Sequence, residues 1–151
     1  MKILTKAVFV LLITTSTLSV FSQKTDNAKK SIFTEFPGTI EISKSTLKNT
    51  LGAIAGQTIS IPFNAHFTFT GKVLSNDLKY SDLQSMIIKS ELYPNTLFQL
   101  SKITNKDNSV KYVGRIINSD ALEVFEIKND MADNYSLQKI DLDKILQDCS
   151  Y

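Results

Sequence analysis

Polar and apolar residues alternate over long stretches of the chain, which is the pattern of strands buried on one face. The clearest case is residues 63–73. Four aromatic or apolar residues and Val73 stand at odd-numbered positions there and would share one face of a strand. The other phase is polar and holds His66, Thr68, Thr70 and Lys72. Because successive side chains of a strand point to opposite faces, we predict that these four polar residues form one outward-facing strip.

A short strand and a short helix are predicted before this region. Residues 38–43 alternate as a strand does, and a Ser/Thr-rich start is followed by Leu47 and Leu51 one helical turn apart. A hydroxyl cap before apolar residues at this spacing is typical of a short amphipathic helix. The helix is expected to end at Gly52 or Gly56.

Short apolar segments separated by Asn- and Asp-rich turns fill most of the remaining chain. Three consecutive apolar residues at the centre of residues 83–92 predict a strand that is buried on both faces there. A meander of four further strands is predicted over residues 96–104, 110–117, 121–127 and 135–140. The connections are too short for parallel crossovers, so consecutive strands should pair antiparallel.

The pattern therefore predicts a mainly β, β-rich α+β fold. We expect an antiparallel sheet of about six to eight short strands with a C-terminal meander. One or two short helices should pack on it, the second suggested by apolar positions at Leu142, Ile145 and Leu146. The sheet could be curled or partly closed as a barrel or sandwich, and the pattern does not distinguish these forms.

The start of the chain has the pattern of a secretory signal peptide. Two lysines precede the apolar run of residues 7–13, and small hydroxyl residues follow it. We predict that residues 1–22 are the signal and that cleavage falls between Ser22 and Gln23, with cleavage after Ser19 as the alternative. A retained anchor fits less well, because a spanning helix needs about 20 predominantly apolar residues.

The first segment resembles the signal peptides of exported bacterial proteins, so a periplasmic or extracellular location is expected. No stable membrane insertion is expected once the signal has been removed. Residues 23–37 are polar without a clear period and are predicted to be a flexible leader, followed by a single β-rich domain over residues 38–151. The chain has one cysteine, Cys149, so no internal disulfide can form.

Removal of the signal also changes the charge. The full chain has 17 Lys and Arg residues against 15 Asp and Glu residues, but residues 1–22 contain two lysines and no acid. The predicted mature chain is therefore neutral, which argues against nucleic acid as a partner. Arg115 is the only arginine, so an arginine cluster for phosphate or carboxylate recognition is excluded.

No motif in the sequence indicates catalysis. His66 is the only histidine, so a two-histidine metal motif cannot be built. The sequence contains neither a G-x-S-x-G nucleophile motif nor a glycine-rich phosphate loop. We therefore expect that the protein binds no cofactor and no metal ion, and that it is not an enzyme.

The function expected from these observations is a non-catalytic binding or interaction module. Its partner would be another protein or an envelope component, and the strip of His66, Thr68, Thr70 and Lys72 is the candidate binding surface. Two alternatives stay open. One is a small secreted hydrolase that uses His66 as its base, and the other is an inhibitor or pro-segment of an exported protease.

Overall fold

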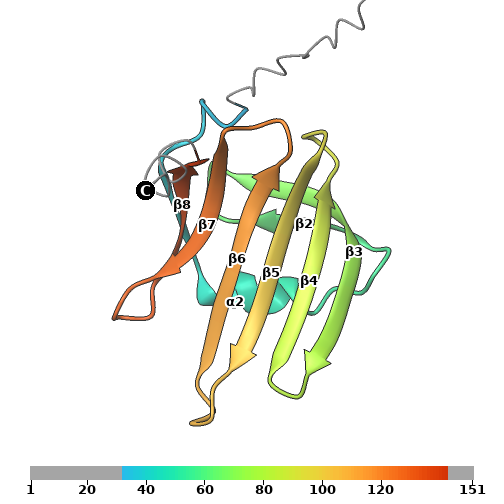
Figure 1. The fold of residues 1–151 in the computed structure, drawn as a ribbon, viewed down its shortest axis with the longest axis vertical. Coiled ribbons are helices and arrows are strands. Elements are labelled where there is room, and N and C mark those ends of the chain that lie inside the picture. Colours follow the sequence, from blue (N-terminus) through green and yellow to red (C-terminus); the bar gives the residue numbers. More distant parts are fainter. Residues whose placement is uncertain (1–31, 143–151) are drawn as a thin grey trace, which may run out of the picture.

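The computed structural model describes residues 32–142. Within this range the chain forms one helix and a single eight-stranded antiparallel sheet (Figure 1). In chain order the elements are β1 (Thr39–Ile42), α2 (Lys44–Thr50), β2 (Thr58–Pro62), β3 (Thr68–Tyr80), β4 (Leu83–Ser90), β5 (Thr96–Thr104), β6 (Val110–Asn118), β7 (Glu123–Asn129) and β8 (Tyr135–Asp141).

The sheet is curled into a half-barrel, with α2 on its concave side (Figure 1). The strand order is β1-β8-β7-β6-β5-β4-β3-β2, so the first two strands lie at opposite edges of the sheet. The chain segment that holds α2 joins these two edges and thereby crosses the concave side. The predicted β-rich antiparallel fold with its C-terminal meander is confirmed. The second predicted helix lies almost wholly outside the described residues.

The hydrophobic core fills the concave side of the sheet beneath α2. One phase of each central strand supplies it, and the residues with almost no exposed surface include Phe69, Met86, Phe98, Leu100, Ile116, Phe125 and Leu137. The other phase is half-exposed or exposed along the same strands. Ile87 belongs to this outer phase, so β4 is buried on one face at its centre, where we expected burial on both.

Helix α2 begins at a serine cap and packs one apolar stripe onto the core. The side-chain oxygen of Ser43 accepts a hydrogen bond from the backbone N–H of Thr46 at 3.0 Å, which satisfies one of the free donors at the helix start. Leu47 and Leu51, one turn apart, are both buried. The helix predicted from these leucines is therefore present and ends at Thr50, close to the predicted end at Gly52.

Residues just before β1 also belong to the core. Phe33 is 2% exposed, and its ring centroid lies 5.5 Å from that of Phe125. The Lys139 ammonium donates hydrogen bonds to the backbone oxygens of Phe33 and Phe36, at 2.6 and 2.7 Å. The predicted leader, residues 23–37, thus includes residues at its end that pack on the domain, while residues 23–31 lie outside the described range.

Replacing Lys139 by methionine is expected to lower the free energy of unfolding by about 1–3 kcal/mol, because two hydrogen bonds from a charged donor are lost. Urea unfolding measures this, and limited proteolysis should cut earlier near Phe33 in the variant. Lys128→Met is the matched control, since Lys128 makes a half-exposed ion pair with Glu126 and such pairs contribute about 0–1 kcal/mol. Equal stability losses in the two variants would contradict the anchoring role of Lys139.

Candidate functional site

The predicted polar strip is divided between a strand and a turn. Thr68, Thr70 and Lys72 share the outward side of β3, and the Thr70 hydroxyl lies 3.0 Å from that of Ser60 on β2. His66 lies in the turn before β3, where its backbone N–H donates to the Asn64 side chain at 2.8 Å. The strip as a binding surface stays a prediction.

The surroundings of His66 offer no partner for acid–base chemistry within residues 32–142. A serine-type hydrolase needs a hydroxyl and a carboxylate in hydrogen-bond contact with the imidazole. Among the described residues, no hydroxyl or carboxylate makes a hydrogen bond with the His66 ring. The described residues also contain no group of three or more His, Cys, Asp or Glu side chains that could hold a metal ion.

A different feature, the helix–sheet pocket, lies between α2 and the ends of β4, β5 and β6. Its volume is about 630 Å³, within the range of about 300–1,000 Å³ that is typical of small-molecule sites. The lining residues are Lys44, Lys48, Leu51, Gly52, Gln84, Lys102, Val110 and Tyr112. The pocket thus combines three lysines with an apolar surface.

Strand register brings the sheet side of this pocket together. Gln84 of β4 is opposite Lys102 of β5, and Lys102 is opposite Tyr112 of β6. The same row continues to Leu78 of β3, which is opposite Gln84 and 71% exposed. Four neighbouring strands therefore present one row of side chains on the concave side, just beyond the core.

Two amides hold the C-terminal end of α2 above this row. The Asn76 side-chain nitrogen donates to the backbone oxygens of Leu51 and Ala53, at 2.9 and 2.8 Å. The Gln84 nitrogen donates to the Leu51 oxygen at 3.1 Å and to the Asn76 side-chain oxygen at 2.9 Å. These bonds satisfy carbonyls at the helix end that lack helical partners. They therefore fix the distance between the end of α2 and the sheet.

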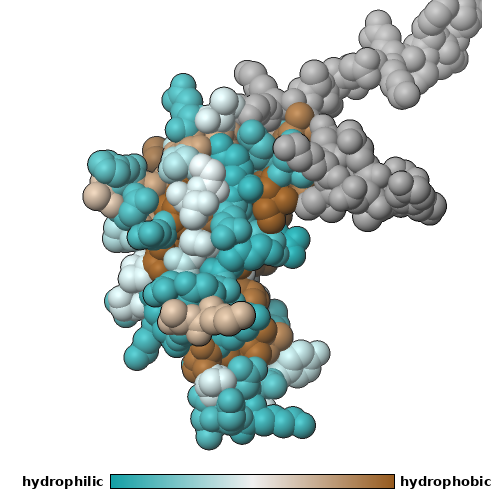
Figure 2. Space-filling model, turned by 90° about the vertical axis from the view of Figure 1, so that its left-hand side faces the viewer, coloured by the Kyte–Doolittle hydropathy of each residue, from teal (hydrophilic) through white to brown (hydrophobic). Residues whose placement is uncertain are grey.

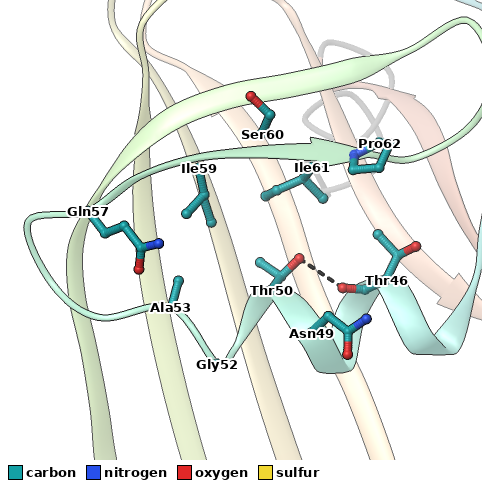
Figure 3. Close-up of a pocket in the computed structure, with 10 residues that line it drawn as sticks. All are labelled: Thr46, Asn49, Thr50, Gly52, Ala53, Gln57, Ile59, Ser60, Ile61 and Pro62. Atoms are coloured by element: carbon teal, nitrogen blue, oxygen red, sulfur yellow. Dashed lines mark hydrogen bonds between the residues drawn. The ribbon is translucent and has the colours of Figure 1, made fainter.

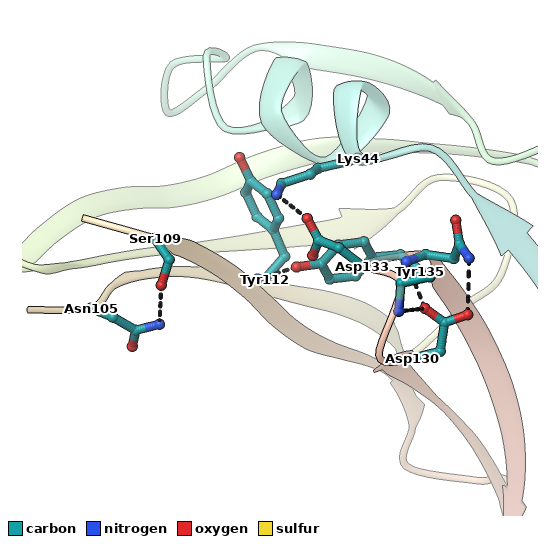
Figure 4. Close-up of polar contacts among 9 residues, drawn as sticks. Lys44, Asn105, Ser109, Tyr112, Asp130, Asp133 and Tyr135 are labelled. Carbon is teal, nitrogen blue, oxygen red and sulfur yellow. Dashed lines mark hydrogen bonds and ion pairs between the residues drawn. The ribbon is translucent and has the colours of Figure 1, made fainter. Parts of the chain in front are cut away.

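The other end of α2 is held by an ion pair (Figure 4). The Lys44 ammonium bonds the carboxylate of Asp133, which lies in the turn between β7 and β8. The hydrogen bond from Lys44 lowers the pKa of Asp133, and the same bond raises the pKa of Lys44. Both groups therefore stay charged at neutral pH, and the positive charge of Lys44 is compensated.

Tyr112 forms part of the pocket wall because β6 and β7 diverge there. These strands pair only at Arg115–Glu126 and Ile116–Phe125. Beyond that point the Tyr135 hydroxyl of β8 reaches across and accepts a hydrogen bond from the Tyr112 backbone N–H at 3.4 Å. The Tyr112 ring is held edge-on against Tyr135, with centroids 5.8 Å apart.

The Tyr112 side chain is 3% exposed and its hydroxyl points toward α2 (Figure 4). Among residues 32–142 this hydroxyl has no side-chain or backbone hydrogen-bond partner. Burial raises the pKa of the phenol, so the group keeps its proton at neutral pH. It is a hydrogen-bond donor directed into the pocket.

The positive charge of the pocket is not balanced by its own walls. Lys48 on α2 and Lys102 on β5 make no ion pair with any residue of the described chain. The lining contains no Asp or Glu. Exposed Lys48 on the helix and part-buried Lys102 on the sheet therefore give this concave site a positive potential.

A second, smaller pocket lies on the other side of α2 and faces β2 (Figure 3). Its volume is about 450 Å³, and its walls are uncharged: Thr46, Asn49, Thr50, Gly52, Ala53, Gln57, Ile59, Ser60, Ile61 and Pro62. The Thr50 hydroxyl that faces it already donates to the Thr46 backbone oxygen at 2.8 Å. This pocket offers fewer free polar groups than the helix–sheet pocket.

The side of the molecule on which β8 lies is mainly hydrophilic, with hydrophobic side chains in small separate areas (Figure 2). The helix–sheet pocket is the stronger candidate site because it combines lysines that have no carboxylate partner among the described residues with apolar surface. This pocket was not predicted from the sequence. The available signal was Lys102, which has the same strand phase as the core residues Phe98 and Leu100.

The chain was compared with known proteins. No protein-family model, no curated protein and no solved structure matches it. No helix within residues 32–142 has the length and apolar character needed to span a bilayer.

Proposed function

We propose that this protein is a non-catalytic binding protein that holds a small molecule in the helix–sheet pocket. The observation that carries the proposal is the concave space itself, in which Lys48 and Lys102, both without a carboxylate partner among residues 32–142, adjoin apolar surface and the Tyr112 hydroxyl. Concave sites of this volume that combine apolar surface with a few polar groups are typical of small-molecule binding. A bound ligand would accept a hydrogen bond from the Tyr112 hydroxyl in place of water.

The composition of the pocket favours binding over catalysis. Its walls supply ammonium groups, a phenol, an amide and aliphatic surface, without a histidine or carboxylate that could serve as a general base. Its two long walls are fixed by the Asn76 and Gln84 amides at one end of α2 and by the Lys44–Asp133 pair at the other. A preformed site of this kind loses little entropy when a ligand binds.

Location is a separate part of the proposal. Export to the periplasm or the extracellular space is expected from the signal-like residues 1–22, which the structure does not describe. The ligand would then be a molecule of that compartment.

The neutral fluorescent probe N-phenyl-1-naphthylamine is expected to bind the pocket and gain intensity in its apolar part. Val110 lies on the pocket wall, and Val110→Trp should fill part of the space. The dissociation constant of the probe should rise about tenfold or more, which corresponds to about 1.4 kcal/mol.

Val113→Trp is the matched control, because Val113 is three residues away on the same strand and points to the opposite face. Probe affinity should be unchanged in this variant, and circular dichroism should show that both variants are folded. A probe that fails to bind the unmodified protein, or that binds both variants equally well, would refute the pocket as the binding site.

A further inference from the structure

We propose that the ligand of the helix–sheet pocket is an anionic amphiphile, with a carboxylate or phosphate head bound between Lys48 and Lys102 and a hydrocarbon body on the apolar wall. This inference rests on the proposed function and names its ligand class. It uses three independent features of the pocket, namely its charge, its apolar surface and its free donor.

The charge comes from opposite walls. Lys48 belongs to α2 and Lys102 to β5, so an anion between them would be contacted from the helix and from the sheet. The charge of Lys44 is already compensated by Asp133. A ligand would therefore meet two uncompensated positive charges, those of Lys48 and Lys102. Lysine is a compact point charge, so the site accepts a carboxylate or a phosphate head without the planar geometry that an arginine fork imposes.

The position of Lys102 supports a role in ligand binding. Lysines on an outer sheet face are ordinary, but Lys102 lies on the inner phase of β5, two residues from the fully buried Leu100. A lysine on this phase lays its aliphatic stem along the apolar wall and presents its ammonium at the pocket, where a counter-charge would bind. No carboxylate of the described residues supplies one, and the head group of a ligand would.

The apolar part of the pocket begins next to these cations. Leu51 and Val110 line it directly, and the ring of Tyr112 extends the surface toward the core. Leu78 continues the same row of the sheet and exposes 71% of its surface. Burial of hydrocarbon against such residues contributes favourably in proportion to the area removed from water.

The Tyr112 hydroxyl completes the recognition of an anion. As a protonated phenol it can donate a hydrogen bond to one oxygen of the head group. A hydrogen bond to a charged acceptor is shorter and stronger than one to a neutral oxygen. The donor and the two ammonium groups therefore favour the same ligand chemistry.

Four ligands with the same twelve-carbon chain test this inference by isothermal titration calorimetry below their micelle concentrations. Dodecanoate and dodecyl phosphate are expected to bind. Dodecanol should bind at least about tenfold more weakly, and dodecyltrimethylammonium should not bind measurably. The tighter of the two anions identifies whether the natural head is a carboxylate or a phosphate.

Lys102→Gln should weaken dodecanoate binding about tenfold while leaving dodecanol binding unchanged. Lys111→Gln is the matched control, because Lys111 is an exposed lysine on the outer face of β6 and should not affect either ligand. Tyr112→Phe should reduce dodecanoate affinity by a smaller factor and keep the ring contact.

The outcomes separate the two levels of the proposal. If dodecanol and dodecanoate bind equally well, or if Lys102→Gln and Lys111→Gln have the same effect, the anionic ligand class is wrong while the pocket still binds small molecules. If neither these ligands nor N-phenyl-1-naphthylamine binds, both the ligand class and the proposed function are wrong.

Discussion

Replacing Phe98 by alanine is expected to lower the free energy of unfolding by about 3–5 kcal/mol. Phe98 lies in β5, has no exposed surface, and contacts the rings of Phe63 and Phe69 with centroid distances of 5.5 and 5.7 Å. Truncation removes the transfer free energy of the ring and leaves a cavity beneath α2. Unfolding by urea, followed by far-UV circular dichroism, measures the loss.

Leu92→Ala provides the comparison for an apolar residue outside the core. Leu92 is 64% exposed in the connection between β4 and β5, so its truncation should change stability by less than about 0.5 kcal/mol. A loss below about 1 kcal/mol for Phe98→Ala would mean that the concave side of the sheet is not the hydrophobic core.

Gly114→Ala is also expected to destabilise the protein. A Cβ atom at Gly114 would lie 2.3 Å from the backbone oxygen of Gln99 and 3.1 Å from Cδ1 of Ile127. Gln99 belongs to the paired strand β5, so its oxygen cannot move without distorting the ladder. Overpacking of this kind costs about 1–3 kcal/mol and sometimes more, measurable as a lower midpoint of urea unfolding.

Gly38→Ala is the same substitution at an open position. A Cβ atom there would meet nothing within 4 Å, so its effect should stay within about 0.5 kcal/mol of the unmodified protein. If both alanine variants are equally stable, the close approach of β5 and β6 at Gly114 is not present in solution.

The strands could be predicted from the sequence because each has one buried and one exposed face. Alternation of residues such as Phe67, Phe69 and Val73 with polar neighbours is a local signal, and it located the first part of β3, up to Val73. The prediction for Ile87 was wrong because the sequence alone does not distinguish an apolar residue on the outer face from one in the core. Only the sheet shows that its side chain is half-exposed.

The way in which the sheet is completed could not be predicted from local pattern. The pairing of β1 with β8 joins residues about 100 positions apart, as Thr39 opposite Gln138 illustrates. The anchoring of Phe33 by Lys139 spans a similar separation. Residues 23–37 are mostly polar and contain two phenylalanines, so the sequence pattern alone predicts a leader. The contact of its end with Lys139 of β8 is evident only in the folded protein.

The candidate site was missed for a related reason. Gln84, Lys102 and Tyr112 lie on three strands and become neighbours only through the register of the sheet. The sequence instead favoured the strip that includes His66 because its members are close along the chain. In the structure three of them share the outer side of β3, and His66 lies in the preceding turn.

Amide chemical-shift mapping of the isotopically labelled protein during titration with dodecanoate tests the central claim most directly. The account predicts saturable changes confined to the C-terminal turn of α2 around Lys48 and to the ends of β4, β5 and β6 around Lys102 and Tyr112. Changes that cluster instead on the strip from His66 to Lys72, or no saturable change at all, would contradict binding in the helix–sheet pocket.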